Sequence, residues 1–207
     1  MNNLIASSGF DSNVKLYDVV KGVPLASFSE HKNVVYNVNW HPSMPNVFAS
    51  CSGDTTLKIW DTKMGKSILI LGKSIKTVKA HPSEVLSCDF NKYENIIATS
   101  GSDGTINIFD LRGTGDIPML TLNGHRLSTR KVAFSPFFGH ILGSVSYDMN
   151  TMIWDIKKNT YVNIFNHHKE FAIGIDFSIF DNKRIATVGW DKALWVFNWD
   201  ENPNKMK

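Results

Sequence analysis

Side chains that could act together as a nucleophile, a base and an orienting acid occur repeatedly along the 207-residue chain. His31, Ser50 and Asp54 form the first complete set. A serine hydroxyl beside an imidazole that a carboxylate orients is the arrangement of a serine hydrolase. Three further sets follow at similar spacing, with Ser or Thr as the hydroxyl: His81, Thr99 and Asp103; His125, Ser144 and Asp148; His168, Thr187 and Asp191.

The recurrence of these sets argues against catalysis, because an enzyme needs one active site rather than one in each repeat. Trp60 and Trp154 follow two of the sets. An indole N–H can donate to the hydroxyl, the hydroxyl to the imidazole and the imidazole to the carboxylate, so each set predicts a structural chain of hydrogen bonds. Phe109 and Phe197, which have no donor, replace Trp in the other two repeats. We therefore expect a protein that is not an enzyme.

The Asp residues of these sets also mark an internal repeat. Asp11 occupies the same position in an earlier repeat, and successive marker Asp residues are 43 to 49 residues apart. Each repeat ends seven residues after its marker, in Trp-Asp at residues 61 and 155 and in a variant at residues 18, 110 and 198. A period near this length with this ending is typical of a β-propeller of WD repeats. The sequence therefore predicts an all-β fold.

The pattern within each repeat predicts four strands. Apolar residues two positions apart, such as Val38 and Trp40, predict an inner strand, and turn residues separate three further apolar or alternating segments. The chain opens inside a second strand and closes after a third, which gives groups of three, four, four, four and three strands. We expect residues 1–207 to form a single incomplete propeller of about 4.5 blades, the C-terminal part of a ring of about seven.

The connection between the second and third repeats is long and rich in lysine. The segment from Lys63 to Lys79 contains five lysines. We interpret it as a solvated loop that carries a short outer strand at Ser67–Ile70, and a basic docking loop is the alternative.

Composition and charge exclude several classes of protein. The net charge of +3, without a long basic run, does not suggest a nucleic-acid partner. No apolar run approaches the roughly 20 residues that span a membrane, so we expect a cytosolic protein without membrane insertion. His167 and His168 lack further ligands at a suitable spacing, and the Gly-rich stretch 100–104 lacks the Lys of a phosphate loop, so neither a metal nor a cofactor is expected.

The turns at the marker Asp residues predict a binding surface. Propellers bind partners mostly on the face that carries these turns, and the residues just before the markers are Phe10, Gly53, Ser102, Tyr147 and Trp190. Aromatic residues are enriched at binding hot spots, and carboxylates beside them suit a cationic amphipathic peptide. With the entrances of the inner strands included, we predict that the peptide-binding residues are Tyr36, Glu84, Arg130, Tyr147, Glu170, Phe171 and Trp190.

Several stretches between the repeat endings closely resemble one family of WD-repeat proteins, the receptors for the type 2 peroxisomal targeting signal, or seventh peroxin. These stretches are Leu86–Asn95, Arg130–Phe137, Ser146–Asp148 and His167–Ser178. The resemblance spans essentially the whole chain and corresponds to the C-terminal two-thirds of the family. The chain departs from the family at Phe109, Phe197 and Asn198 and in its lysine-rich segment.

The resemblance implies an import receptor that binds a helical N-terminal signal on cargo proteins. That signal has Arg-Leu and, after five further residues, His-Leu; the receptor works with a co-receptor and cycles between cytosol and peroxisome. Glu84, Glu170, Tyr147 and Trp190 are the best-placed matches for such a helix. The alternative is a histone-binding WD-repeat chaperone or another WD-repeat scaffold, because those chaperones also carry a Glu after the repeat His and a Phe-Asn-x-Tyr turn.

Overall fold

The computed structural model describes residues 3–63, 74–113 and 117–200, and these residues form eighteen strands in five antiparallel sheets. Each sheet is a simple meander in chain order. The strands, sheet by sheet, are β1 (Leu4–Ser8), β2 (Val14–Asp18) and β3 (Val23–Phe28); β4 (Val35–Trp40), β5 (Val47–Ser52), β6 (Thr56–Asp61) and β7 (Lys76–Lys79); β8 (Val85–Phe90), β9 (Ile96–Gly101), β10 (Ile106–Asp110) and β11 (Leu120–Leu122); β12 (Thr129–Phe134), β13 (Ile141–Ser146), β14 (Thr151–Asp155) and β15 (Thr160–Phe165); β16 (Ala172–Phe177), β17 (Arg184–Gly189) and β18 (Leu194–Asn198).

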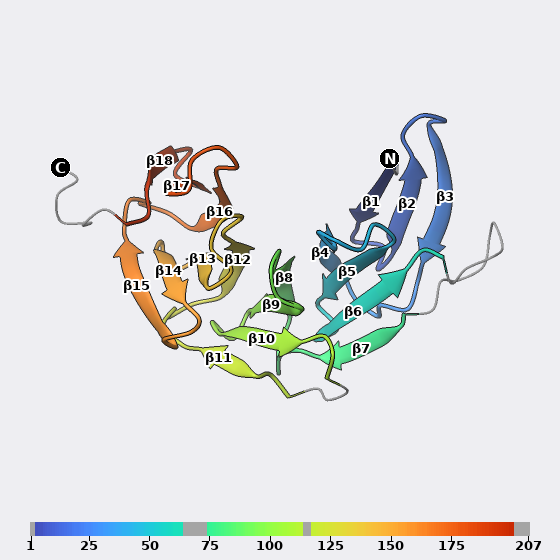
Figure 1. The fold of residues 1–207 in the computed structure, drawn as a ribbon, viewed down its shortest axis with the longest axis horizontal. Helices are drawn as coiled ribbons and strands as arrows, with labels where there is room; N and C mark the ends of the chain where they lie inside the picture. Colours follow the sequence, from blue (N-terminus) through green and yellow to red (C-terminus); the bar gives the residue numbers. More distant parts are fainter. Residues whose placement is uncertain (1–2, 64–73, 114–116, 201–207) are drawn as a thin grey trace.

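The five sheets are successive blades of an open arc (Figure 1). The inner strands β4, β8, β12 and β16 lie on the concave side, and the outer strands β7, β11 and β15 lie on the convex side. The expected all-β, incomplete propeller is thereby confirmed, with the strands grouped in threes and fours as the repeats predict. The extent of the domain and a complete ring of about seven blades remain predictions.

Apolar clusters fill the spaces between neighbouring blades. Trp60 packs against Phe28 and Phe48 between the first two blades, with ring centroids 5.1 and 6.0 Å away. Trp154 belongs to the corresponding cluster between the third and fourth blades. Burial of a large apolar side chain stabilises a fold by roughly 1.5–3 kcal/mol, so the Trp of a repeat ending joins its blade to the preceding one. Cys51 and Cys88 are free thiols buried in the cluster between the second and third blades.

The tight turn between the second and third strands of each blade is built around its marker Asp. The carboxylate accepts the backbone N–H two residues later in all five blades, as in the 3.0 Å bond from Thr56 to Asp54. The residue directly after the marker has a positive φ in every blade: Ser12, Thr55, Gly104, Met149 and Lys192. The Asp side chain thus supports a left-handed backbone position that residues other than glycine rarely adopt.

The lysine-rich segment corrects one prediction. Its last four residues, Lys76–Lys79, are the outer strand β7, which pairs with β6 from Thr56↔Lys79 to Ile59↔Lys76. The interpretation as a solvated loop is therefore wrong at this end, whereas the outer strand expected at Ser67–Ile70 lies outside the described residues. Val78 is buried between exposed neighbours, and the flanking lysines hide this single apolar position in the sequence.

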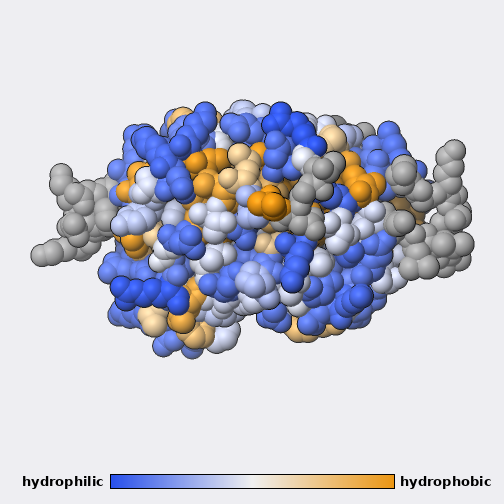
Figure 2. Space-filling view, turned by 90° about the horizontal axis from the view of Figure 1, so that it is seen from below, coloured by the Kyte–Doolittle hydropathy of each residue, from blue (hydrophilic) through white to orange (hydrophobic). Residues whose placement is uncertain are grey.

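The convex side of the arc, seen from below, shows separate hydrophobic patches among hydrophilic residues (Figure 2). Scattered exposed apolar residues are normal on soluble domains and carry no conclusion by themselves. Within the described ranges, no helix has the length and apolar character that crossing a membrane would require.

Candidate functional site

The expected hydrogen-bonded sets occupy the interior of the blades. Trp60 Nε1 donates to Ser50 Oγ at 2.8 Å, Ser50 Oγ lies 2.7 Å from His31 Nε2, and His31 Nδ1 lies 2.8 Å from Asp54. The fourth blade repeats this chain with nearly equal distances through Trp154, Ser144, His125 and Asp148. One assignment of protons satisfies all three bonds, with the histidine donating from Nδ1 and accepting at Nε2.

These sets are closed to a substrate. Ser50 and Ser144 have no exposed surface, and each hydroxyl oxygen already accepts an indole N–H. Burial opposes the negative charge on Asp54, but hydrogen bonds from His31 and Thr56 outweigh it and hold the pKa of this carboxyl well below its usual value. The same balance, with His125 as the donor, lowers the pKa of Asp148 to about 2. Asp residues whose ionised form is favoured and buried hydroxyls suit a structural role.

In the third and fifth blades Phe replaces the Trp of the set, so no indole N–H donates to the hydroxyl. His81 contacts Thr99 at 2.9 Å and Asp103 at 3.1 Å, and His168 contacts Thr187 at 3.0 Å and Asp191 at 3.1 Å. In the third blade the buried Asn107, which sequence reasoning missed, donates to the Ala80 carbonyl at 2.8 Å and accepts from Thr121 at 2.6 Å. Its signal in the sequence is one polar residue inside the apolar run Ile106–Phe109.

Three of the residues proposed for peptide binding form an aromatic group. The rings of Tyr147 and Phe171 are stacked with centroids 4.7 Å apart, and Trp190 lies 5.2 Å from Phe171 and 6.4 Å from Tyr147. A backbone bond from Trp190 N–H to the Phe171 carbonyl, 2.9 Å long, fixes the two loops together. Trp190 keeps 60% of its surface exposed, so the group presents an apolar face to solvent.

Three others form a polar group that joins three blades. Tyr36 lies on β4, Glu84 directly precedes β8, and Arg130 lies on β12. The Tyr36 hydroxyl donates to Glu84 Oε1 at 3.3 Å, and the Arg130 guanidinium lies over the Tyr36 ring with Cζ 6.0 Å from its centroid. The absence of a side chain at Gly53 leaves room for Glu84, because a Cβ there would stand 3.1 Å from Glu84 Oε1.

The aromatic and polar groups are neighbours. Burial raises the pKa of the Tyr36 hydroxyl above its usual value, and the charge of Glu84 adds to this effect. The two groups meet on the fourth blade, because Thr129 pairs with Ser146 and the Tyr147 N–H donates to the Ser128 carbonyl at 3.1 Å, so that Arg130 and Tyr147 lie at the same end of β12 and β13. We call the six residues of both groups the candidate surface: Tyr36, Glu84, Arg130, Tyr147, Phe171 and Trp190.

Other residues of the expected surface lie at the border of the candidate surface or on another blade. Glu170 is exposed, and within the described part of the chain no hydrogen bond or ion pair joins it to the candidate surface. Phe10 is 86% exposed on the first blade. Ser102 borders the candidate surface, because its N–H donates to the Glu84 carbonyl at 2.9 Å and its own carbonyl accepts a bond from Ser128. Among the residues described, no three His, Cys, Asp or Glu side chains gather where they could share a metal ion.

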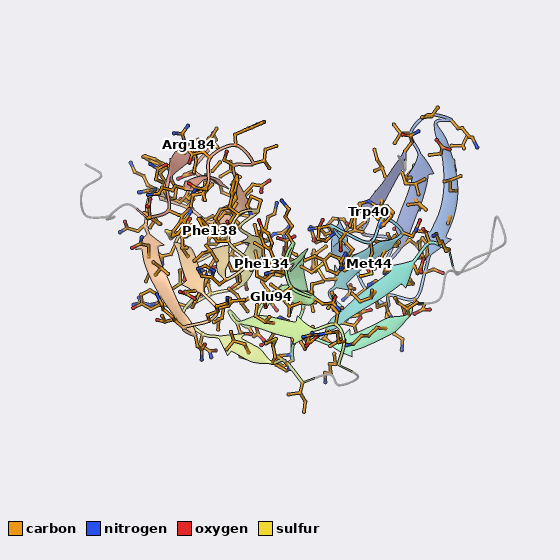
Figure 3. The ribbon with its side chains drawn as sticks, in the orientation of Figure 1. Trp40, Met44, Glu94, Phe134, Phe138 and Arg184 are labelled. Carbon is orange, nitrogen blue, oxygen red and sulfur yellow. The ribbon has the colours of Figure 1, made fainter. Side chains whose placement is uncertain are left out.

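A polar cavity of about 290 Å³ lies along the inner strands, lined by residues of β4, β8, β12 and β16. Asp89 accepts the side-chain N–H of Asn39 at 2.6 Å and the backbone N–H of Phe134 at 2.7 Å. It therefore ties β8 to both neighbouring inner strands, and burial raises its pKa to about 7. Trp40 and Phe134, which end β4 and β12, lie on opposite sides of β8 in Figure 3.

The repeats match a known sequence family as well as a fold. The model for the WD domain, G-beta repeat, matches residues 22–61, 72–110 and 117–155. The chain belongs to the WD-repeat family. The matched repeats end at residues 61, 110 and 155, where β6, β10 and β14 also end.

Similar proteins include two receptors. The WD-repeat chain is 31% identical to the peroxisomal targeting signal 2 receptor of Saccharomyces cerevisiae over 87% of this chain and 56% of the receptor. It is 37% identical to the receptor of the same name from Mus musculus over 94% of this chain and 59% of the receptor. The nuclear distribution protein PAC1 of Candida dubliniensis is 32% identical over 88% of this chain and 37% of that protein.

These similarities confirm the resemblance of the sequence to receptors for the type 2 peroxisomal targeting signal. The WD-repeat chain spans somewhat more than half of the length of each of these two receptors.

Proposed function

We propose that this WD-repeat chain is part of a peroxisomal import receptor that binds the helical type 2 targeting signal of cargo proteins. The observation that carries the proposal is the candidate surface, where an exposed aromatic group adjoins a carboxyl group on a chain similar to such receptors. A co-receptor would act with it, and the receptor would cycle between cytosol and peroxisome. It is a binding function, without catalysis, a cofactor, a nucleic-acid partner or insertion into a membrane.

The chemistry of the signal fits the candidate surface. An amphipathic helix that carries Arg and His beside Leu needs a carboxylate for its cations and an apolar contact for its Leu side chains. Glu84 supplies the carboxyl group, and the Tyr147, Phe171 and Trp190 rings supply the apolar contact. Glu170, exposed beside Phe171, is available for the second cation of the helix.

Binding of a fluorescent signal peptide to the chain tests the proposal. Trp190→Ala should weaken binding by about tenfold or more, because an exposed aromatic residue at the centre of a contact is a hot spot. Phe180→Ala is the matched control, since Phe180 is an exposed aromatic residue of the same blade that lies in the turn between β16 and β17, at the end of β17 opposite Trp190. A peptide with its Arg changed to Glu should bind weakly. Equal binding of the two peptides would contradict the proposal.

The alternative of a histone-binding chaperone or another WD-repeat scaffold has its own readout. The same assay with purified core histones as the competitor separates the two functions. Binding of histones without binding of the signal peptide would favour the chaperone. Binding of the signal peptide that Trp190→Ala weakens and that histones do not compete away would favour the receptor.

A further inference from the structure

Arg130 has an unusual position for a cationic side chain of the candidate surface. It lies on β12, yet its guanidinium reaches across the third blade to the Tyr36 ring of the second. Its Nη1 donates to the Leu86 carbonyl on β8 at 3.3 Å. The guanidinium is thus held over the concave side by one ring and one carbonyl.

The contacts of Arg130 lack a carboxylate. Among the described residues no ion pair includes Arg130, whereas Arg112 pairs with Asp110 at 2.8 Å and Arg184 pairs with Asp181 at 3.3 Å. A guanidinium held by a ring face and one neutral carbonyl is bound more weakly than one in a bidentate ion pair. Arg130 can therefore leave its position at a small free-energy cost.

The position that Arg130 occupies has the components of a site for a guanidinium. Tyr36 offers its ring face, and the Tyr36 hydroxyl holds Glu84 Oε1 at 3.3 Å beside that ring. Arg130 lies over this ring without an ion pair to Glu84, whereas a guanidinium that approaches from the hydroxyl edge of the ring can contact the ring and the carboxyl group together, and planar guanidinium groups suit both partners. An arginine of a bound helix would gain both contacts, and the other side chains of that helix would hold it in place.

We infer that Arg130 is a built-in competitor that fills the cation position of the empty candidate surface and is displaced by an arginine of the bound peptide. This inference rests on the proposed function. A site that its own side chain fills in most molecules binds its ligand more weakly, in proportion to the fraction of molecules in which it is free. Arg130 would also raise specificity, because only a cationic residue gains the contact with Glu84 that offsets the displacement of Arg130.

The experiment measures the affinity of the signal peptide for the whole chain and for Arg130→Met, which keeps an unbranched side chain but removes the charge. Arg184→Met is the matched control, since Arg184 begins β17 at the end opposite Trp190 and loses the same charge (Figure 3). A second peptide has Met in place of its Arg. The Arg130→Met chain should bind the Arg peptide about three- to tenfold more tightly and the Met peptide unchanged.

Three outcomes overturn the inference. Unchanged or weaker binding of the Arg peptide by Arg130→Met, with wild-type binding intact, shows that Arg130 is no competitor and leaves the receptor function standing. If Arg184→Met also binds the Arg peptide more tightly, or if Arg130→Met also binds the Met peptide more tightly, the gain in affinity does not come from a vacated guanidinium site and the inference is wrong. Failure of every chain to bind either peptide contradicts the receptor function itself, and the inference with it. Equal unfolding temperatures of the chains exclude loss of folding as the cause of any difference.

Discussion

At the scale of the residue, one hydroxyl in each of the second to fifth blades connects a histidine to its surroundings. Ser144 accepts the Trp154 indole N–H at 2.8 Å and contacts His125 at 2.7 Å, with no surface exposed to solvent. Thr187 occupies the equivalent place and contacts His168 at 3.0 Å, but Phe197 at the Trp position offers it no indole N–H. A buried donor or acceptor that loses its partner costs about 1–3 kcal/mol.

Removal of the hydroxyl should therefore affect the two blades unequally. Ser144→Ala leaves two buried partners unsatisfied and should lower the free energy of unfolding by about 2–3 kcal/mol, whereas Thr187→Val leaves one and should lower it by about 1 kcal/mol. Urea unfolding of the three chains measures the difference. The competing hydrolase interpretation expects an ester-cleaving activity that Ser144→Ala abolishes while the unfolding curve stays unchanged.

At the scale of the element, the turn after each second strand decides where the third strand begins. The residue after the marker Asp is left-handed in all five blades, and only the third blade uses glycine there. Gly104 is also crowded, because a Cβ would stand 3.1 Å from the Leu127 carbonyl oxygen. Gly22, in another turn, has a positive φ with nothing within 4 Å of its Cβ position.

These two glycines separate the effect of the backbone from that of crowding. Gly22→Ala should lower the free energy of unfolding by about 1 kcal/mol, the usual cost of a left-handed residue with a side chain. Gly104→Ala should cost about 1 kcal/mol more, since the preceding loop must also move. Thermal unfolding of both variants checks this order. An equal loss in the two would mean that the contact with Leu127 is relieved freely.

Strand positions follow from the sequence wherever the repeat is regular. The His, Ser and Asp positions recur at nearly constant spacing, so they indicate the number of strands and the partners of each histidine. β7 escapes this reasoning because Lys76 and Lys79 flank a single buried valine, and the positive φ after each marker Asp escapes it because Thr, Met and Lys give no sign of a left-handed turn. Pairing with β6 determines the strand at β7, and the marker Asp side chain determines the left-handed turn, whereas the polarity and type of the local residues indicate neither.

At the scale of the whole molecule, the candidate surface exists only because neighbouring blades converge. Its polar group joins the second, third and fourth blades through Tyr36, Glu84 and Arg130. Its aromatic group joins the fourth blade to the fifth, because Tyr147 of the fourth blade packs against Phe171 and Trp190 of the fifth. The sequence places each residue at the entrance of a strand or turn. It does not contain the angle between blades, which determines that Arg130 reaches Tyr36.

The most direct test of the central claim exchanges the charges of the ligand and the candidate surface. Signal peptides bearing Arg or Glu at the same position are titrated against the wild-type chain and against Glu84→Arg, and their dissociation constants are compared. Because opposite charges attract and like charges repel across a contact, Glu84→Arg should weaken binding of the Arg peptide by at least about tenfold and restore binding of the Glu peptide. If Glu84→Arg leaves the preference between the two peptides unchanged, Glu84 does not face the cation of the signal and the candidate surface is not where the helix binds.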